Sequence, residues 1–285
     1  YTGCMIGNHA VAVVAEAIAK GQADRFNASR LYGMLKGAAL GPRPHAGREA
    51  VEAYLSNGYV PVEANKHSAS LTLSYAFDDA GLGKIARHLG RDSEAAAFAK
   101  RSAAAFKAGW SVERELMCPR SNASSKLHCP LLPFVPYPGS PHYVEGDALQ
   151  WLWFVPEDPA SLVGLFKSPD RFVARLDDFL QRARDIKSTV LPNPWYWAGN
   201  EPDLLAPWLY AFVPGQQYKT ASATRWIASH RYRDAPDGLP GNDDYGTLSA
   251  WLVWAQLGVY PLAGSDLFVL GSPRFAEVVI GLGGG

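Results

Sequence analysis

Three short stretches of the sequence place carboxylates beside a glycine where the pattern predicts that a helix begins. They are HYVEGDALQW (142–151), WYWAGNEPD (195–203) and GNDDYG (241–246). A single acid at a helix start is explained by capping of the free N–H groups and by the helix dipole. Asp243 and Asp244 are adjacent, however, and one cap needs one residue. The second carboxylate is therefore available for chemistry.

Carboxylates in three loops, flanked by aromatic residues, suit the hydrolysis of a glycosidic bond. One carboxyl group protonates the leaving oxygen while another activates water, and loop oxygens bind a hard cation. Each stretch alone also has a structural explanation, Glu145 as a first-turn acid and Asn200-Glu201 as a turn before Pro202. Together the three stretches predict a sugar cleft with an acid, a base and metal ligands.

Other catalytic signatures are missing from the sequence. The seven histidines show no HExxH pairing, and neither zinc-type cysteine spacing nor an EF-hand loop, a GxSxG elbow or a phosphate loop occurs. Lys plus Arg and Asp plus Glu both number 27, and no block of like charge stands out. This balance argues against a nucleic-acid partner or an anionic membrane surface.

Helical periodicity dominates the 285 residues. The predicted helices cover 9–21, 23–40, 67–90, 93–110, 146–154, 159–166, 168–183, 203–212, 216–230 and 245–258. Residues 111–144 contain six prolines and read as a long loop. From 259, short β-branched runs between Gly and Pro predict strands. Helix pairs followed by β structure predict a mainly α-helical toroid or bundle that leads into a terminal β element.

Weak signals favour the secretory pathway. No apolar run is long enough to span a membrane, and the chain opens without an initiator Met, as the inside of a longer protein would. Cys118 and Cys129 flank a loop-like stretch and could pair, although three ordinary cysteines are an equally good reading. Asn27 and Asn122 each begin an N-glycan acceptor sequon.

Six stretches, in order, resemble glycoside hydrolase family 92, the calcium-dependent exo-acting α-mannosidases. They are GCMIGNHAVAVVAEAIAKG, SLTLSYAFDDAGLGKIARHLG, YVEGDALQWLWFVPED, WAGNEPDLLAPWLY, GLPGNDDYGTLSAW and LGVYPLAGSDLFVLGSPRF. The resemblance extends over nearly all of the chain. It implies that residues 1–258 form a portion of an (α/α)6 barrel and that 259–285 begin a C-terminal β segment. It also implies that the family's N-terminal β-sandwich is absent from this chain.

The resemblance also implies roles for individual residues in an inverting mechanism. Glu145 matches the general acid and Asp244 the general base, while Asp243 tunes its neighbour, caps the helix or binds a sugar hydroxyl. Asn200 and Glu201 match the segment that supplies Ca²⁺ ligands. The residues implied to contact the sugar are Asn242 and the aromatic platforms Trp151, Trp195 and Trp197, of which at least one is expected in the core.

The implied substrate is a terminal α-linked mannose, α-1,2 in the first instance, on an oligosaccharide or a glycoprotein glycan. The sequence departs from the family pattern at three places: Ser74 replaces a glutamate, Glu157 a histidine, and Asp203-Leu204 a histidine pair. These departures keep two alternatives open. The chain could be a catalytically silent carbohydrate-binding remnant, or another (α/α)6-barrel hydrolase that acts on a different sugar.

Overall fold

Helices make up most of the regular structure in this computed structural model, which describes residues 6–41, 47–131, 141–186 and 193–281. The α-helices are α1 (Ala10–Ala19), α2 (Ala28–Leu40), α3 (Val51–Asn57), α4 (Ser68–His88), α5 (Asp92–Ala108), α6 (Pro159–Leu165), α7 (Pro169–Arg184), α8 (Gln217–His230) and α9 (Thr247–Leu257). Short 3-10 helices are η1 (Ala23–Arg25), η2 (Trp151–Trp153), η3 (Glu201–Asp203) and η4 (Ala206–Phe212).

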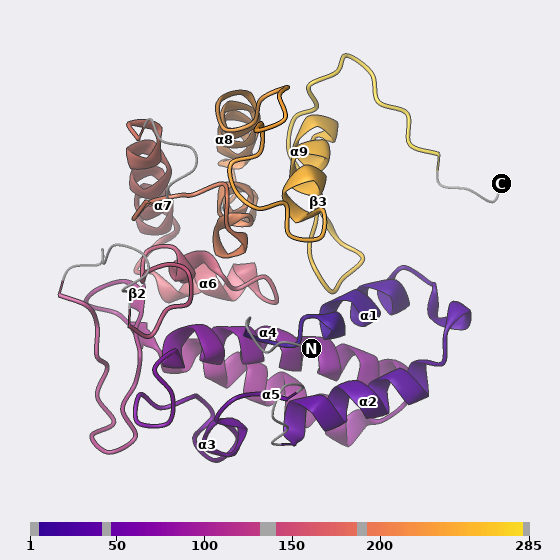
Figure 1. Ribbon diagram of the computed structural model, residues 1–285, viewed down its shortest axis with the longest axis vertical. Helices are drawn as coiled ribbons and strands as arrows, with labels where there is room; N and C mark the ends of the chain where they lie inside the picture. The colour runs from indigo at the N-terminus through magenta and orange to yellow at the C-terminus, as the bar shows by residue number, and fades with distance from the viewer. Residues whose placement is uncertain (1–5, 42–46, 132–140, 187–192, 282–285) are drawn as a thin grey trace.

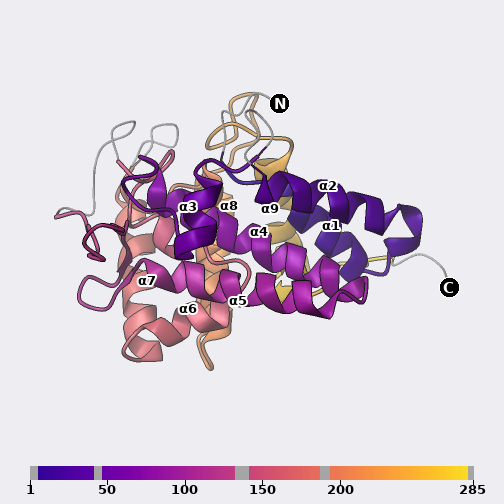
Figure 2. The ribbon, with the colours of Figure 1, turned by 90° about the horizontal axis from the view of Figure 1, so that it is seen from below.

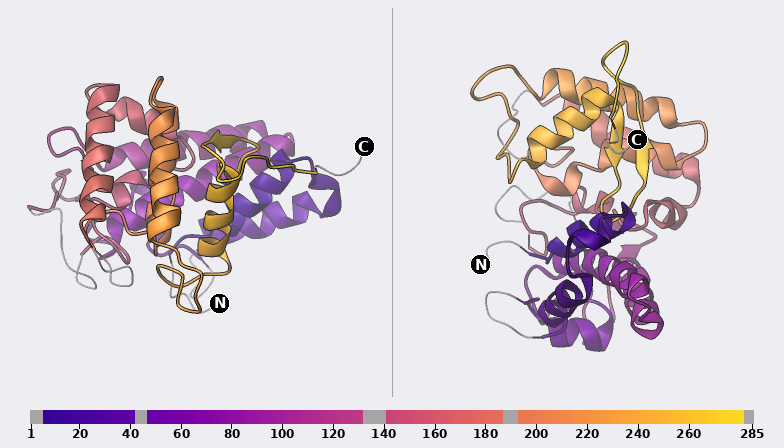
Figure 3. Two further views of the ribbon diagram at one scale, coloured as in Figure 1. Left: turned by 90° about the horizontal axis from the view of Figure 1, so that it is seen from above. Right: turned by 90° about the vertical axis from the view of Figure 1, so that its right-hand side faces the viewer.

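The helices form two groups (Figure 1). Helices α1, α2, α4 and α5 lie together in one group, and α7, α8 and α9 stand side by side in the other, as Figure 3 also shows. Figure 2 shows α4 and α5 packed lengthwise against each other. A small apolar cluster fills the space between α1, α2, α4 and α5, while a larger one rich in Trp, Phe and Tyr joins the two groups. The burial of these aromatic faces dominates the packing energy.

Helix α4 carries buried charge at its centre. The carboxylates of Asp78 and Asp79 are completely buried. Arg48 and Arg101 contact Asp79 at 2.7 and 2.5 Å, and the ring of His9 lies 2.8 Å from Asp78. Removing one partner from such a cluster leaves an uncompensated buried charge, which costs about 3–5 kcal/mol. The cluster therefore fixes the start of α1 against the middle of α4.

The predicted helices are confirmed where periodicity and end signals agree. Ser168 caps α7 by accepting a hydrogen bond from the Arg171 N–H, and Pro169 occupies the first helical turn. Helix α2 begins similarly, because the Asn27 side chain accepts from the Arg30 N–H at 2.9 Å. Helix α3 was not among the predicted helices, since its seven residues offer little periodicity.

Two predicted α-helices are wrong. Residues 146–154 form only the 3-10 turn η2, because the Asp147 carboxylate accepts the N–H groups of Leu149 and Gln150 at 2.7 and 3.1 Å. Such local bonds compete with helical ones. Residues 203–212 form 3-10 turns with Pro207 near the start of η4. An apolar pattern alone does not distinguish these tight turns from an α-helix.

Two antiparallel strand pairs complete the described secondary structure. The first joins β1 (Trp110–Ser111) to β2 (Leu116–Met117), at the start of the stretch that reads as a loop in the sequence; α5 ends at Ala108, so Trp110 belongs to β1 and not to the predicted helix 93–110. The second joins β3 (Val259–Pro261) to β4 (Phe268–Leu270), in the region predicted to contain strands. Within the residues that the structure describes, no helix combines the length and apolar character needed to cross a membrane.

Candidate active site

One open cavity of about 570 Å³ brings the three predicted loops together. The first loop precedes η2, the second leads into η3, and the third connects α8 to α9 and projects beyond the ends of both helices (Figure 3, left). The predicted site residues that line the cavity are Glu145, Trp197, Asn200, Asn242, Asp243 and Asp244. Residues up to 99 positions apart in the sequence therefore face one space.

The second and third loops pack against each other through their main chains, at Gly199 and Gly241. A Cβ atom on Gly199 would lie 2.4 Å from the Pro240 carbonyl oxygen, and one on Gly241 would lie 2.4 Å from the Gly199 carbonyl oxygen. No real Cβ atom fits at such distances, so glycine is required on both sides of the crossing. The crossing fixes Asn200 and Glu201 close to Asp243 and Asp244.

The adjacent aspartates have different surroundings. The Asp243 carboxylate accepts hydrogen bonds from the backbone N–H and the hydroxyl of Ser249, at 2.9 and 2.8 Å, and so caps the first turn of α9. Asp244 is exposed to the cavity, and its side chain reaches that of Glu201 instead. Of the roles that the sequence left open for Asp243, capping is the one its contacts support.

Glu145 and Asp244, the predicted acid and base, both have left-handed backbone angles. Glu145 has φ 48°, and Asp244 and Tyr245 have φ 44° and 59°. Non-glycine residues seldom adopt this region, and each instance costs about 1–3 kcal/mol unless its surroundings compensate. The turn at Asp244 is held by the Thr247 hydroxyl and N–H, which both donate to the Asp244 carbonyl oxygen. Strained backbone of this kind concentrates at functional sites.

The position of Glu145 is fixed by a hydrogen bond to its main chain, so its side chain can face the cavity. The Asn200 side-chain amide donates to the Glu145 carbonyl oxygen at 2.8 Å. Burial raises the pKa of the Glu145 carboxyl, and the negative charge of Asp244 raises it further. A raised pKa keeps a carboxyl group protonated at higher pH, as a general acid requires.

Glu201 completes a group of three carboxylates. Burial raises its pKa, its own backbone N–H opposes that effect, and the charge and hydrogen bond of Asp244 and the charge of Glu145 add to the rise. Three acids this close repel one another when ionised. A bound divalent cation would relieve that repulsion, and carboxylate and amide oxygens are donors of the kind Ca²⁺ takes.

The side-chain set for a metal is small. Within the described residues, no group of three or more His, Cys, Asp or Glu side chains is arranged to hold a metal ion. The amide nitrogen of Asn200 is used by Glu145, so its amide oxygen remains available. Asn200 and Glu201 therefore fit a calcium site by donor type, and the remaining ligands would come from backbone carbonyls, water or substrate hydroxyls.

The three candidate tryptophans have separate fates. Trp151 is 4% exposed, and its indole N–H donates to the Val144 carbonyl oxygen at 2.8 Å. Trp151 therefore lies in the core, as expected from the sequence for at least one of the three, and does not line the cavity. Trp195 stacks under the Arg182 guanidinium, 4.7 Å from the ring centroid, and does not line the cavity. Trp197 alone of the three lines the cavity.

The positions that depart from the family pattern lie outside the cavity. Asp203 is 1% exposed, and its carboxylate accepts the Trp197 N–H at 2.7 Å from beneath. Ser74 is fully buried within α4. Glu157 lines a groove between α4 and α5, where burial raises its pKa to about 8. None of the three lines the cavity described above.

Two residues near the site escaped the sequence reasoning. Ser70 of α4 accepts the Val144 N–H at 2.8 Å, and the Tyr143 hydroxyl donates to the Met117 carbonyl oxygen at 2.7 Å. The first contact spans 74 residues, so no local pattern could reveal it. Tyr143 lies only two residues before Glu145, and that proximity is the signal that could have drawn attention to it.

The helical fold, whose loops meet over this open cavity, is of the (α/α)6-toroid class. The chain belongs to glycosyl hydrolase family 92, whose catalytic domain profile matches residues 1–285.

Solved and curated relatives agree with this family. A family GH92 α-mannosidase from Bacteroides thetaiotaomicron, solved in complex with mannoimidazole, is 30% identical with a TM-score of 0.82, over 95% of this chain and 36% of that one. A family GH92 inverting mannosidase from the same organism is 25% identical with a TM-score of 0.80, over 96% and 39%. An uncharacterized secreted glycosidase of Arthroderma benhamiae is 27% identical, over 96% of this chain and 38% of that protein. The chain thus spans less than two fifths of the length of these relatives.

Proposed function

We propose that the protein to which this chain belongs is an exo-acting α-mannosidase that inverts the anomeric centre and depends on Ca²⁺. The observation that carries the proposal is the convergence of Glu145 and Asp244, from loops far apart in the sequence, on one cavity. Glu201 does not line that cavity, but it lies close enough to both carboxylates for their charges to raise its pKa. The mannosidase structures named above support mannose as the sugar. The preference for an α-1,2 linkage rests on the resemblance of the motifs alone.

The two catalytic roles follow from the surroundings of the carboxyl groups. Glu145, whose pKa is raised by burial and by the charge of Asp244, donates a proton to the glycosidic oxygen as the bond to the anomeric carbon breaks. Asp244, exposed in the cavity, accepts a proton from the water that attacks the opposite face. One proton leaves Glu145 and one arrives at Asp244, so the pair must exchange protons with solvent before the next turnover.

Activity of the full-length protein tests this proposal. Incubation with α-1,2-, α-1,3- and α-1,6-linked mannobioses is expected to release mannose, fastest from the α-1,2 isomer. Proton NMR at early times is expected to show β-mannose first, because inversion converts the α-linkage to a β-product. Calorimetric binding of mannose without any turnover would instead support the carbohydrate-binding alternative. Hydrolysis of an aryl glycoside of a different sugar, with no hydrolysis of mannosides, would support the alternative that the enzyme acts on another sugar.

Asn200 and Glu201 are the proposed metal ligands. When bound there, Ca²⁺ would hold the 2- and 3-hydroxyls of the mannose and favour flattening of its ring. We expect chelation with EDTA to lower kcat/KM by about 100-fold or more, since a metal at such a centre contributes several kcal/mol. Added Ca²⁺ should restore the rate and raise the melting temperature. If neither EDTA nor added Ca²⁺ changes the rate or the melting temperature, the metal has no role in the mechanism.

Secretion is proposed for the parent protein on three grounds. Cys118 and Cys129 form a disulfide bond, which persists in oxidising compartments. The sequon residues Asn27 and Asn122 are both exposed. The curated relative is described as secreted. A mannose-containing oligosaccharide or glycoprotein glycan outside the cell is the partner consistent with these observations.

A further inference from the structure

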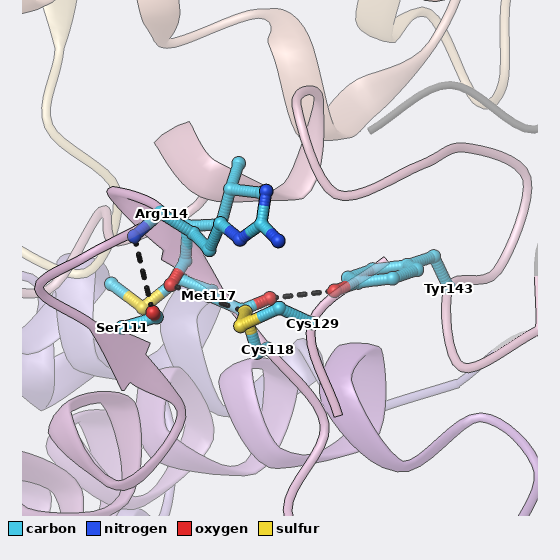
Figure 4. The surroundings of a disulfide bond; sticks show 7 residues. Ser111, Arg114, Met117, Cys118, Cys129 and Tyr143 are labelled. Atoms are coloured by element: carbon cyan, nitrogen blue, oxygen red, sulfur yellow. Dashed lines mark hydrogen bonds between the residues drawn. A yellow bond between two sulfur atoms is a disulfide. The ribbon is translucent and has the colours of Figure 1, made fainter. Parts of the chain in front are cut away.

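A disulfide-closed hairpin lies beside Tyr143 (Figure 4), which belongs to the loop 142–146 that carries Glu145 and is here called the acid loop. The hairpin consists of the antiparallel pair β1–β2 and the segment 118–129 that follows it. The disulfide bond between Cys118 and Cys129 joins the two ends of that segment. The Cys118 N–H donates to the Gly109 carbonyl oxygen at 2.6 Å, and a β-bridge pairs Arg120 with Leu127. A covalent bond and these backbone contacts restrict the motion of the hairpin relative to the end of α5.

Tyr143 connects this hairpin to the acid loop. Its hydroxyl donates to the carbonyl oxygen of Met117, which directly precedes Cys118, at 2.7 Å (Figure 4). Tyr143 and Met117 are 3% and 2% exposed. A hydrogen bond excluded from water is costly to leave half made, because the orphaned carbonyl would stay desolvated. The contact therefore holds the acid loop at one place against the hairpin.

The acid loop needs such restraint because its backbone is strained at both ends. His142 has φ 76° and Glu145 has φ 48°. Between them, the Val144 N–H donates to the Ser70 hydroxyl at 2.8 Å, and the Tyr143 side chain is anchored in the core. Strained backbone persists only where its surroundings over-determine it. Of the two residues between the strained positions, Tyr143 is the one whose side chain is buried in the core.

We propose that Tyr143 is a positioning residue for the general acid, and that the disulfide hairpin acts on Glu145 through the hydroxyl of Tyr143. This inference rests on the proposed function. A proton donor acts only at hydrogen-bond distance from the leaving oxygen, so displacement of Glu145 slows the reaction in proportion to its need for protonation. A loss of general stability or of substrate binding would slow all substrates alike.

The experiment compares Tyr143→Phe with the wild type in the full-length protein with Ca²⁺. Methyl α-mannoside needs its leaving oxygen protonated, whereas dinitrophenyl α-mannoside does not. We expect kcat/KM for methyl α-mannoside to fall about 10-fold or more, since a misplacement near 1 Å can cost up to about 100-fold. For dinitrophenyl α-mannoside we expect a change below about 3-fold, because no protonation is at stake.

Tyr75→Phe is the matched control. The Tyr75 hydroxyl donates to the backbone carbonyl of Glu49 at 3.0 Å, and the residue is 1% exposed, so the same chemical group is removed from an equally buried site. Thermal unfolding of both variants measures the structural cost. Tyr75→Phe is expected to change the two substrates by the same factor, whereas Tyr143→Phe is expected to separate them.

A second variant tests the hairpin itself. The double substitution Cys118→Ala and Cys129→Ala is expected to slow methyl α-mannoside more than dinitrophenyl α-mannoside, in the direction of Tyr143→Phe. Uniform loss on both substrates in Tyr143→Phe, with an active wild type, would overturn the inference and leave the proposed function intact. A wild type that hydrolyses neither mannoside would refute the proposed function, and the inference with it.

Discussion

Glu145→Gln is expected to lower kcat/KM for methyl α-mannoside and for mannobiose by about 1,000-fold, since general acid catalysis contributes about 100- to 10,000-fold. Glutamine keeps the size of the side chain but has no proton to give. The Glu145 backbone contacts, including the bond from Asn200, do not involve the carboxylate. The fold is therefore expected to survive, and the melting temperature should change little.

The choice of leaving group makes this prediction specific. Dinitrophenyl α-mannoside departs without a proton, so its hydrolysis should fall by less than about 10-fold. An equal loss on both substrates would contradict the role of Glu145 as the acid. The pH dependence gives a second reading. Because burial and Asp244 raise the pKa of Glu145, wild-type activity should persist to higher pH than an ordinary glutamic acid allows, and Glu145→Gln should lose that alkaline limb.

Asp244→Asn is expected to abolish turnover of every mannoside, by about 1,000-fold or more, including the dinitrophenyl substrate. In an inverting mechanism, water attacks the anomeric carbon in the same step in which the leaving group departs. Both kinds of substrate therefore need the base. Asparagine tolerates left-handed backbone as aspartate does, and the turn is held through the Asp244 carbonyl oxygen. The substitution is therefore expected to leave the loop in place.

Asp234→Asn provides the matched control for this loss. Asp234 is exposed in the same loop between α8 and α9 and does not line the cavity, so the net charge changes equally. Steady-state kinetics on methyl and dinitrophenyl α-mannosides should distinguish the two variants. Full activity of Asp244→Asn on either substrate would exclude Asp244 as the base.

The helices were predictable where side-chain periodicity alone decides the structure. Helix α7 has an apolar face, a serine cap and a proline in its first turn, and each signal indicates the same boundary. Residues 146–154 look equally helical in sequence, but the Asp147 side chain takes two backbone N–H groups and produces a 3-10 turn. Competition from a local side chain is harder to read than apolar spacing.

The site was predictable only as a set of loops. Adjacent aspartates between two glycines indicated that one carboxylate had no structural task, and Asp243 is the one that caps α9. The backbone angles at Asp244 decide which of the two aspartates caps α9. These angles cannot be read from the sequence. The burial of Trp151 and the bond from Tyr143 to Met117 depend on long-range packing. Motif order therefore identified the loops, and the fold was needed to assign the tasks within them.

The crossing of Gly199 and Gly241 has a consequence for how such an enzyme can diversify. Neither loop can acquire a side chain at that point, because each would strike the main chain of the other. Substitutions that change the preference of the proposed enzyme for its sugar are therefore expected at other positions, for instance at Asn242, which lines the cavity. The two loops are therefore expected to change together or not at all at this point, because a side chain on either glycine would displace the other loop.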